Sequence, residues 1–363
     1  MKKLYIIAGE DSGDLHGSNL IKALRAKVPL AVRGIGGDNM QAQGVELVAH
    51  IKDTNFMGFV EILRNINKIR KLFRTIKSDI INWKPDAVVL IDYPGFNLRM
   101  AKFIHQLGIK VLYYISPQVW AWKKGRVKKI KKYTDRMLVI LPFEQAFYAR
   151  EGVEVDFVGH PLLDVIDLQT NAQEAAGKPI VALLPGSRKQ EIHRMLPVML
   201  ALADHFPSYQ FVIAGAPSQE KEFYQQLIGH SDLGLVMNQT YQLLAKASYA
   251  IVTSGTATLE TALFRVPEIV CYKGSAISYF IGKRLVKVEF ISLVNLILGR
   301  KAVAELIQYE YTVDKVAHQL KRLMQVDTQK HLFKDYDELR EKLGNKGASK
   351  RAATVILEEL SSL

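Results

Sequence analysis

Short runs of hydrophobic, β-branched residues alternate along the whole chain with segments of helical periodicity. The runs that predict strands lie at Leu4–Ala8, Ala87–Ile91, Val111–Ile115, Met137–Ile140, Ile180–Leu184, Gln210–Ala214, Tyr249–Thr253 and Glu268–Tyr272. Most of them are almost continuously apolar, which is typical of parallel strands that are buried on both faces. Helices are predicted between the strands, for example at Gly17–Lys27, Glu191–His205 and Thr256–Phe264. This alternation in two blocks predicts an α/β protein with two Rossmann-like, doubly wound domains.

A polar and weakly patterned segment, Asp164–Lys178, separates the two blocks. We therefore expect an N-terminal Rossmann-like domain at residues 1–165 and a C-terminal one at 175–335. Residues 336–363 follow as C-terminal helices with a break near Gly344–Gly347, and they could pack back on the N-terminal domain or on a partner chain. Two α/β domains of similar size leave a cleft between them, which is a usual place for a small-molecule site.

The composition is that of a folded protein. Of the 363 residues, 48% are hydrophobic and 23% are charged, which excludes an intrinsically disordered protein. The single cysteine, Cys271, excludes a disulfide scaffold and a cysteine-built zinc site, and it fits a reducing compartment. No stretch approaches the roughly 18 consecutive apolar residues of a membrane span, and acidic residues interrupt the start too early for a secretion signal. We therefore expect a cytoplasmic protein.

The charge is basic and unevenly distributed. The chain has 49 Lys and Arg against 36 Asp and Glu, a formal net charge of +13. Residues 1–170 alone have 26 basic against 17 acidic side chains. A basic first half suits a polyanion, an anionic membrane or a phosphorylated substrate, and charge alone does not choose among them.

Two acidic residues lie within two positions of the ends of predicted strands of the first domain. Glu10 lies in the segment AGEDSGD after the first strand, and Asp92 begins DYPGFN after the second. Ligands of α/β proteins bind at the carboxyl ends of the strands, where burial would raise the pKa of a carboxyl group and suit a general base. Asp11 and Asp14 are better explained as helix caps, and a turn-capping role for Asp92 before the following proline stays equally open. The acids and the glycine spacing argue against a nicotinamide site.

Two loops of the second domain are predicted to bind an anion. The segment LPGSR opens a helix after the Ile180–Leu184 strand, and TSGTATLE opens another after the Tyr249–Thr253 strand. Backbone N–H groups at a helix N-terminus attract anions, Arg188 adds a fork of donors, and a carboxylate at Glu260 can bind ribose hydroxyls. Either loop alone could be a mere turn, but two in one domain favour a nucleotide diphosphate. The candidate binding residues are Ser187, Arg188, Ser254, Gly255, Thr256 and Glu260.

Motifs for other chemistries are missing from the sequence. It contains no G-x-x-x-x-G-K-[ST] segment, which excludes a P-loop ATPase or kinase. The nine histidines include no H-E-x-x-H pattern, and the D-x-D at Asp335–Asp337 is typical of a solvated helix face. We expect neither a metal nor a cofactor, because Arg188 and helix N-termini can neutralise a leaving phosphate.

Two segments of the first domain combine apolar and basic residues. The segment FMGFV leads into the basic amphipathic stretch RNINKIRKLFRTIK, and WAWKKGR begins a second lysine-rich stretch. Aromatic residues beside lysines suit a membrane interface. Alternatively, the apolar stripe of the helix packs on the sheet and its charges are solvated, and nucleic-acid binding has no recognition motif in its favour. The candidate acceptor- or membrane-facing residues are Phe56, Met57, Phe59, Trp120, Trp122, Lys123 and Arg126.

Taken together, these segments are similar to those of lipid-A-disaccharide synthase, a bacterial glycosyltransferase family of the two-Rossmann GT-B type. The resemblance runs through most of the chain, in the family's order: AGEDSGD, GIGGDNM, MGFVEIL, IDYPGFN, YISPQVWAW, LPFEQAFY, VGHP, LLPGSR, TSGTATLE and ISLVNLILG. SPQVWAW with PGSR and SGTATLE is a highly specific combination. Many relatives have a second acid in the motif I-D-x-P-D-F-N, where this chain has Gly95, so Asp92 is the acid of that loop.

The resemblance implies a reaction of UDP-2,3-diacylglucosamine with 2,3-diacylglucosamine 1-phosphate (lipid X). The products are a β(1→6)-linked disaccharide 1-phosphate and UDP, in the biosynthesis of lipid A and lipopolysaccharide. We expect one displacement with inversion, in which Asp92 is the base and Glu10 is either the rival base or a residue that positions sugar hydroxyls. Buried acyl chains contribute about 0.8 kcal/mol per CH₂ group and could supply much of the affinity for the acceptor.

The resemblance also implies where each substrate binds. The second domain would hold the UDP half, with Arg188 and the Ser254–Thr256 amides at the diphosphate, Glu260 at the ribose and Asn295 near the donor. The basic first domain would hold the acylated acceptor at the cytoplasmic face of the inner membrane, as a peripheral protein. A homodimer is possible, and no nucleic acid is implied.

Two other functions stay open from the sequence. The nearest is another UDP-sugar enzyme of the GT-B type, either a lipid-linked N-acetylglucosaminyl transferase or a UDP-N-acetylglucosamine epimerase. The more distant is a basic peripheral-membrane or RNA-binding protein with a degenerate nucleotide fold. The two intact anion loops argue against the second function.

Overall fold

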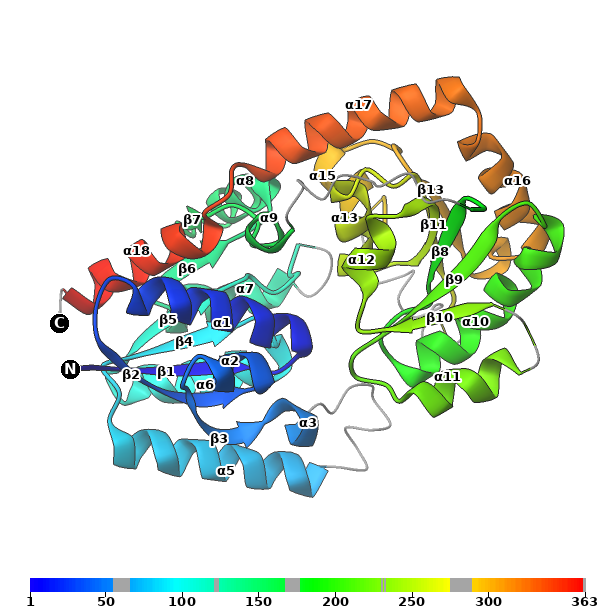
Figure 1. Cartoon of the computed structure of the whole chain (residues 1–363). Helices are drawn as coiled ribbons and strands as arrows, with labels where there is room; N and C mark the ends of the chain where they lie inside the picture. Colours follow the sequence, from blue (N-terminus) through cyan, green and yellow to red (C-terminus); the bar gives the residue numbers. More distant parts are fainter. Residues whose placement is uncertain are drawn as a thin grey trace. The chain divides into compact units, whose positions relative to one another are not determined.

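The computed structural model describes residues 1–54, 66–120, 124–166, 177–229, 231, 233–274 and 289–361. The chain divides into two compact units, of which unit 1 comprises Met1–Asp164 and Asn345–Leu363, and unit 2 comprises Val165–Gly344. Each unit contains one parallel β-sheet flanked by helices (Figure 1). Among the helices of the described ranges, none is both long and apolar enough to cross a membrane.

Unit 1 is built on a seven-stranded sheet in the order β3-β2-β1-β4-β5-β6-β7. Its strands are β1 (Lys2–Ala8), β2 (Leu30–Gly36), β3 (Glu46–His50), β4 (Ala87–Ile91), β5 (Lys110–Tyr114), β6 (Arg136–Val139) and β7 (Asp156–Phe157). The chain winds outward from β1 to β3, returns to β4 beside β1, and then winds outward the other way. The direction of winding therefore reverses between β1 and β4, and this reversal is the switch point where doubly wound sheets bind ligands.

The helices of unit 1 cover both faces of this sheet, which explains why every residue of β4 is fully buried. Their bounds are α1 (Asp11–Arg25), α2 (Asp38–Ala42), α3 (Ile51–Thr54), α5 (Ile66–Trp83), α6 (Pro94–Gln106), α7 (Val127–Tyr133), α8 (Pro142–Arg150), α9 (Leu162–Val165) and α18 (Ala348–Ser361). A short 3₁₀ turn, Lys124–Arg126, precedes α7.

Unit 2 repeats the same plan with six parallel strands in the order β10-β9-β8-β11-β12-β13. Its strands are β8 (Ile180–Leu184), β9 (Gln210–Gly215), β10 (Gly234–Met237), β11 (Ala247–Thr253), β12 (Glu268–Tyr272) and β13 (Ala304–Ile307). Its helices are α10 (Lys189–Leu202), α11 (Lys221–Ile228), α12 (Thr240–Leu244), α13 (Thr256–Leu263), α15 (Leu293–Leu298), α16 (Val313–Leu323) and α17 (Val326–Leu343). The switch point of this sheet lies between β8 and β11.

The predicted fold class is confirmed, and all the strands predicted from apolar runs are present. The sequence pattern missed β2, β3, β7, β10 and β13. Four of these are outer strands of their sheets, and β3, β7 and β10 have no fully buried residue. A strand with a neighbour on one side alone does not need a continuous apolar run, so its hydrophobic signal is weak.

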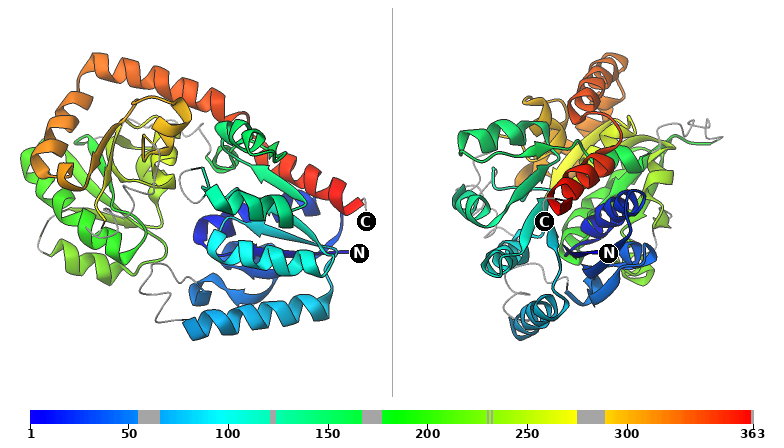
Figure 2. Two further views of the ribbon diagram at one scale, coloured as in Figure 1. Left: turned by 180° about the vertical axis from the view of Figure 1, so that it is seen from behind. Right: turned by 90° about the vertical axis from the view of Figure 1, so that its left-hand side faces the viewer.

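The C-terminal helices belong to different units. The boundary expected at 335/336 falls inside α17, and the structure places the division between Gly344 and Asn345. Helix α18 packs alongside α1 of its own chain (Figures 1 and 2). Its N-terminus is capped by Asp164, whose carboxylate accepts the backbone N–H of Gly347 at 2.5 Å and of Ser349 at 2.8 Å.

Candidate functional site

The carboxyl ends of β1 and β4 bring Glu10 and Asp92 to the switch point of unit 1. Ala8 and Ile91 are direct partners in the parallel ladder, so the loops after them begin side by side. Glu10 is the N-cap residue of α1, in an extended conformation, and Asp92 is the first residue after β4. The two acids lie close enough for the charge of Glu10 to act on the pKa of Asp92.

The backbone around Asp92 adopts an uncommon conformation. Asp92 and Tyr93 have φ angles of +42° and +47°, in the left-handed region that disfavours side chains with a Cβ atom. The buried Asn97 donates hydrogen bonds from Nδ2 to the carbonyls of Asp92 at 2.8 Å and Ile91 at 3.1 Å. The hydroxyl of Tyr113 donates to the same Asp92 carbonyl at 2.6 Å. Asn97 and Tyr113 therefore hold the loop in this conformation, and the sequence analysis missed both roles.

The carboxyl group of Asp92 is poised to exchange a proton near neutral pH. Burial raises its pKa to about 7, the negative charge of Glu10 acts in the same direction, and the Tyr93 backbone N–H acts against them. The N-cap of α6 is Tyr93, so Asp92 is not the capping residue of that helix. A half-buried carboxyl group with this pKa, next to a second acid, suits general-base catalysis.

The other acids of the first loop are structural or exposed. Asp14 is buried, and its carboxylate accepts the backbone N–H groups of Gly37 at 2.6 Å and Met40 at 3.0 Å. It therefore caps α2 and not its own helix, which refines the expected capping role. Asp11 is an exposed residue in the first turn of α1, but its carboxyl group is partly buried, and this partial burial and the charge of Asp14 raise its pKa.

An aromatic row leads from the Asp92 loop to α5. The ring of Tyr93 covers Gly9 so closely that a Cβ atom at Gly9 would lie 2.3 Å from it. Phe96 stacks on Tyr93 with ring centroids 5.6 Å apart and on Phe73 of α5 at 4.1 Å. The apolar stripe of α5 packs on the core, as one of the two alternatives expected. Its exposed face presents Lys68, Arg70, Lys71 and Arg74.

Most residues expected to face the acceptor or the membrane lie outside the described ranges. These are Phe56, Met57, Phe59, Trp122 and Lys123. Trp120 is half-buried and contacts Phe143 edge to face, with centroids 4.9 Å apart. Arg126 is half-buried in the turn before α7, where burial lowers the pKa of its guanidinium and the Tyr113 hydroxyl acts against this. Arg126 therefore lies near the tyrosine that holds the Asp92 loop.

At the switch point of unit 2, the β8 loop presents an arginine at a helix N-terminus. Leu184 and Val252 are partners in the ladder, so the loops after β8 and β11 also begin side by side. Arg188 is the N-cap residue of α10, is exposed, and pairs with Glu191 at 3.1 Å. The backbone of Ser187 is held by the amide of Gln219, which donates to its carbonyl at 2.8 Å.

In the loop after β11, the first residue, Ser254, is hydrogen-bonded within the fold, and the next two residues are exposed. Ser254 donates its backbone N–H to the Cys271 carbonyl at 2.9 Å and its hydroxyl to the Ile291 carbonyl at 2.9 Å. The Ser254 amide is therefore committed to the fold, which corrects its expected place among the diphosphate donors. Gly255 and Thr256 are exposed at the N-terminus of α13. The first N–H groups of a helix have no carbonyl of a preceding turn to bind, and here only that of Thr258 reaches back, to the Gly255 carbonyl at 3.2 Å, among the bonds of the described residues.

Asn295 supports the β11 loop indirectly. It is fully buried, and its Nδ2 donates to the Val303 carbonyl at 3.0 Å and to Glu305 at 2.8 Å. Its Oδ1 accepts the N–H groups of Ala302 at 2.8 Å and Val303 at 2.9 Å. Both donors and both acceptor positions of the amide are therefore occupied within the fold. Glu305, which Asn295 holds, in turn accepts the backbone N–H of Ile291 at 3.0 Å, so Asn295 supports the Ile291 segment through Glu305.

Glu260 lies one turn into α13 and is half-buried. Its Oε1 accepts a hydrogen bond from the hydroxyl of Tyr241 at 3.0 Å. Burial raises the pKa of Glu260, and the hydrogen bond from Tyr241 acts in the opposite direction. The sequence analysis did not single out Tyr241, because no local pattern links it to a residue in the next helix.

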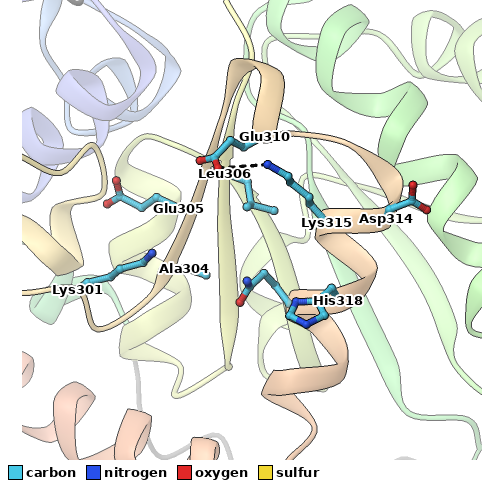
Figure 3. A pocket seen from close by; sticks show the side chains of 9 residues that line it. Lys301, Ala304, Glu305, Leu306, Glu310, Asp314, Lys315 and His318 are labelled. Carbon is cyan, nitrogen blue, oxygen red and sulfur yellow. Dashed lines mark hydrogen bonds and ion pairs between the residues drawn. The ribbon is translucent and has the colours of Figure 1, made fainter.

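A pocket of about 360 Å³ lies on another part of unit 2, between β13 and α16 (Figure 3). Its charged lining residues carry both signs: Lys301, Glu305, Glu310, Asp314 and Lys315. None of the residues predicted to bind the donor lines it. Within the described ranges, no group of three or more His, Cys, Asp or Glu side chains could hold a metal ion.

Comparison with known proteins decides the family. The family model for lipid-A-disaccharide synthetase matches residues 4–358. The chain is 42% identical to the lipid-A-disaccharide synthase of Geobacter metallireducens over 376 residues, which covers 99% of this chain and 97% of that protein. The chain belongs to the lipid-A-disaccharide synthase family. It is equally similar, at 42% over 372 residues, to the lipid-A-disaccharide synthase of Syntrophus aciditrophicus, with 98% of this chain and 97% of that protein covered.

Solved structures share the fold of this lipid-A-disaccharide synthase family member at much lower identity. The S. aureus MnaA–UDP co-structure has a TM-score of 0.67 at 14% identity and covers 100% of this chain and 98% of that one. The glycotransferase of kitacinnamycin has a TM-score of 0.65 at 12% identity, with 99% and 98% covered. Both confirm the GT-B type of α/β fold. The family membership makes the chain a glycosyltransferase.

Proposed function

We propose that the protein transfers 2,3-diacylglucosamine from UDP to 2,3-diacylglucosamine 1-phosphate. The product is the β(1→6)-linked disaccharide 1-phosphate of lipid A biosynthesis, and UDP is released. The family membership supports this reaction, and the observation that carries it is the chemistry at the two switch points. One presents a carboxyl group with a pKa of about 7, and the other presents an arginine and two helix N-termini.

The reaction is a single displacement with inversion. The 6-hydroxyl oxygen of the acceptor attacks the anomeric carbon of the donor sugar, and the bond from that carbon to the UDP oxygen breaks. Asp92 takes the proton of the 6-hydroxyl, and UDP leaves with the bonding electron pair. Burial raises the pKa of Asp92 and the charge of Glu10 adds to this rise, and Glu10 binds sugar hydroxyls beside it.

The donor side neutralises the leaving group. Arg188 and the first-turn N–H groups of α10 and α13 stabilise the diphosphate charge as it develops, and Glu260 binds the ribose hydroxyls. Gly255 leaves room for the diphosphate at the start of α13. Asn295 acts indirectly, because it holds Glu305, which binds the Ile291 backbone to which Ser254 is bonded.

The acceptor side faces an anionic membrane surface. The exposed basic face of α5 and the lysines of α7 supply positive charge, each worth about 1 kcal/mol near anionic lipid. The aromatic row from Phe73 to Tyr93 connects α5 with the Asp92 loop and offers apolar contact for an acyl chain. The protein would then work as a peripheral enzyme on the cytoplasmic face of the inner membrane.

The test is a reconstituted reaction. Purified protein is incubated with UDP-2,3-diacylglucosamine and lipid X in the presence of EDTA, and the disaccharide 1-phosphate is sought by mass spectrometry. Product formation supports the donor, the acceptor and a reaction without a divalent metal. If product forms only after magnesium is added, the proposal of a metal-free reaction is wrong, and the proposed donor and acceptor stand. If neither condition gives product while UDP still binds, the proposed reaction is wrong and another UDP-sugar substrate must be sought.

Three variants assign the base. Asp92→Asn and Glu10→Gln keep the shape of each side chain and remove its ability to take a proton. Asp11→Asn is the matched control, an acid of the same loop that lies exposed in the first turn of α1. We expect Asp92→Asn to abolish turnover and Asp11→Asn to retain it. If Asp92→Asn keeps activity within a few-fold of wild type and Glu10→Gln does not, Glu10 is the base.

A further inference from the structure

Tyr241 is a polar residue at the donor side to which the proposed mechanism gives no role. It lies in α12, which follows β10, and its hydroxyl donates to Glu260 of α13 at 3.0 Å. The two helices follow strands that are separated by β9 and β8 in the sheet. The contact therefore joins two distant loops at the carboxyl edge of the sheet, the edge at which α/β proteins bind ligands.

The position of Tyr241 is fixed at two points. Its ring packs on Phe264 with centroids 5.5 Å apart and an interplanar angle of 43°, and Phe264 is the C-cap residue of the helix that contains Glu260. Its hydroxyl is bonded to Glu260 at the other end. Burial and the charge of Glu260 raise the pKa of Tyr241, so the hydroxyl keeps its proton at neutral pH and remains a donor.

This contact limits what the Glu260 carboxylate can do. A carboxylate offers about four lone pairs on two oxygens, and Tyr241 occupies one of those on Oε1. A hydrogen bond to one oxygen restricts rotation of the carboxylate group about its bond to the side chain. The remaining lone pairs then point in fixed directions, as two neighbouring ribose hydroxyls require. The carboxylate therefore loses less rotational freedom when the ribose binds.

We infer that Tyr241 is a positioning residue that lets Glu260 discriminate a ribonucleotide from its 2′-deoxy analogue. This inference rests on the proposed function, in which Glu260 binds the ribose of the UDP group. A site built to bind a hydroxyl rejects the analogue that lacks it, because the acceptor in the protein is left unpaired. Loss of the Tyr241 hydroxyl lets the carboxylate rotate, and this weakens the contact with the ribose more than any other contact of the nucleotide.

The experiment measures binding of UDP and of 2′-deoxy-UDP to the full-length protein by isothermal titration calorimetry. The variants are Tyr241→Phe, Glu260→Gln and the double variant. Tyr209→Phe is the matched control, because it removes a tyrosine hydroxyl from the same unit at the opposite edge of the sheet, directly before β9. Thermal unfolding of each variant reports any general loss of stability.

We expect wild type and Tyr209→Phe to prefer UDP to 2′-deoxy-UDP by about tenfold or more. In Tyr241→Phe the preference falls about fivefold, through weaker UDP binding, and the affinity for 2′-deoxy-UDP stays within about twofold. Glu260→Gln loses most of the preference, and adding Tyr241→Phe to it has no further effect, because two residues that act through one contact are not additive.

Three results would overturn the inference, and they have different meanings. An unchanged preference in Tyr241→Phe, with a reduced one in Glu260→Gln, leaves Tyr241 with a structural role alone. An unchanged preference in Glu260→Gln removes the ribose contact of Glu260, and the role of Tyr241 with it, while the proposed reaction stands. Failure of the wild-type protein to bind UDP removes the donor site of the proposed function itself.

Discussion

In unit 1 the strands at the switch point, β1 and β4, are followed by Glu10 and Asp92, whereas the corresponding strands of unit 2, β8 and β11, are followed by PGSR and SGTATLE. The same place in the same topology therefore presents two acidic residues in one unit and the N–H groups of helix N-termini in the other. A doubly wound sheet fixes where a ligand binds, and the residues after its strands fix which chemistry is available there.

The two sites also differ in the burial and the backbone conformation of their residues. Asp92 is half-buried on a left-handed backbone that Asn97 and Tyr113 hold in place, and this suits the proposed base, which needs a raised pKa and a fixed direction. Arg188, Gly255 and Thr256 are exposed, which is compatible with the proposed diphosphate site, since a helix N-terminus attracts an anion without being buried. Substitutions in unit 1 should therefore act on the chemical step, and those in unit 2 on donor binding.

The largest expected effect is that of Asp92→Asn. We expect kcat to fall about 10²- to 10⁴-fold, the usual contribution of a general base, while the Kd for UDP stays unchanged. The measurements are steady-state kinetics and UDP titration of the full-length protein. Weaker UDP binding in this variant would contradict the separation of roles between the units.

The stability of Asp92→Asn provides the control for folding. The pKa of Asp92 is raised in the folded state, so the folded protein holds this proton more tightly than the unfolded chain. The contribution of this group to wild-type stability is therefore greatest below pH 4 and falls as the pH rises from about 4 to about 7. The variant lacks this fall, so its melting temperature at pH 8 should equal or exceed that of wild type.

The next effect is that of Arg188→Ala. We expect the Kd for UDP and the KM for the donor to rise about 10- to 100-fold, because a charge-assisted contact with the diphosphate is lost. The matched control is Lys189→Ala, the adjacent residue, whose ammonium group lies over the Phe223 ring at 5.5 Å. An Arg188→Ala variant with unchanged UDP affinity would remove Arg188 from the diphosphate site.

The pH dependence tests the two acids of unit 1 together. Because the base must be unprotonated, kcat/KM should rise about tenfold per pH unit below pH 7 and level off above it. In Glu10→Gln the removal of a negative charge should lower the pKa of Asp92 and move this rise to lower pH. A rise at the same pH in both proteins would show that Glu10 does not act on the base.

The smallest effect is expected from Tyr113→Phe. It removes one of the hydrogen bonds that hold the Asp92 carbonyl, so kcat should fall about three- to tenfold while UDP affinity is unchanged. Tyr133→Phe is the matched control, a tyrosine at the end of α7 whose ring packs edge to face on His105. Equal losses in the two variants would indicate a general effect of tyrosine removal instead of one on the Asp92 loop.

Much of the fold could be predicted because its signals are local. Buried parallel strands appear in the sequence as apolar runs, and short motifs mark the loops after them. For this reason the sequence singled out Glu10, Asp92, Arg188 and Glu260. The edge strands could not be predicted, because their half-buried residues do not form a continuous hydrophobic run. The bonds that engage the Ser254 amide and the Asn295 side chain could not be predicted for a different reason, since they are made to groups that are distant in the sequence.

The sequence by itself determined the two doubly wound sheets, the two sets of chemical groups at their carboxyl edges and the resemblance to one family. Only the tertiary structure decided how those groups are held. Asn97 and Tyr113 fix the Asp92 loop, Tyr241 fixes Glu260, and α18 joins unit 1 across more than 180 residues of sequence through the cap provided by Asp164. Hydrogen bonds of this kind connect residues without any periodic relation in the chain, so they appear only once the folded backbone brings their partners together.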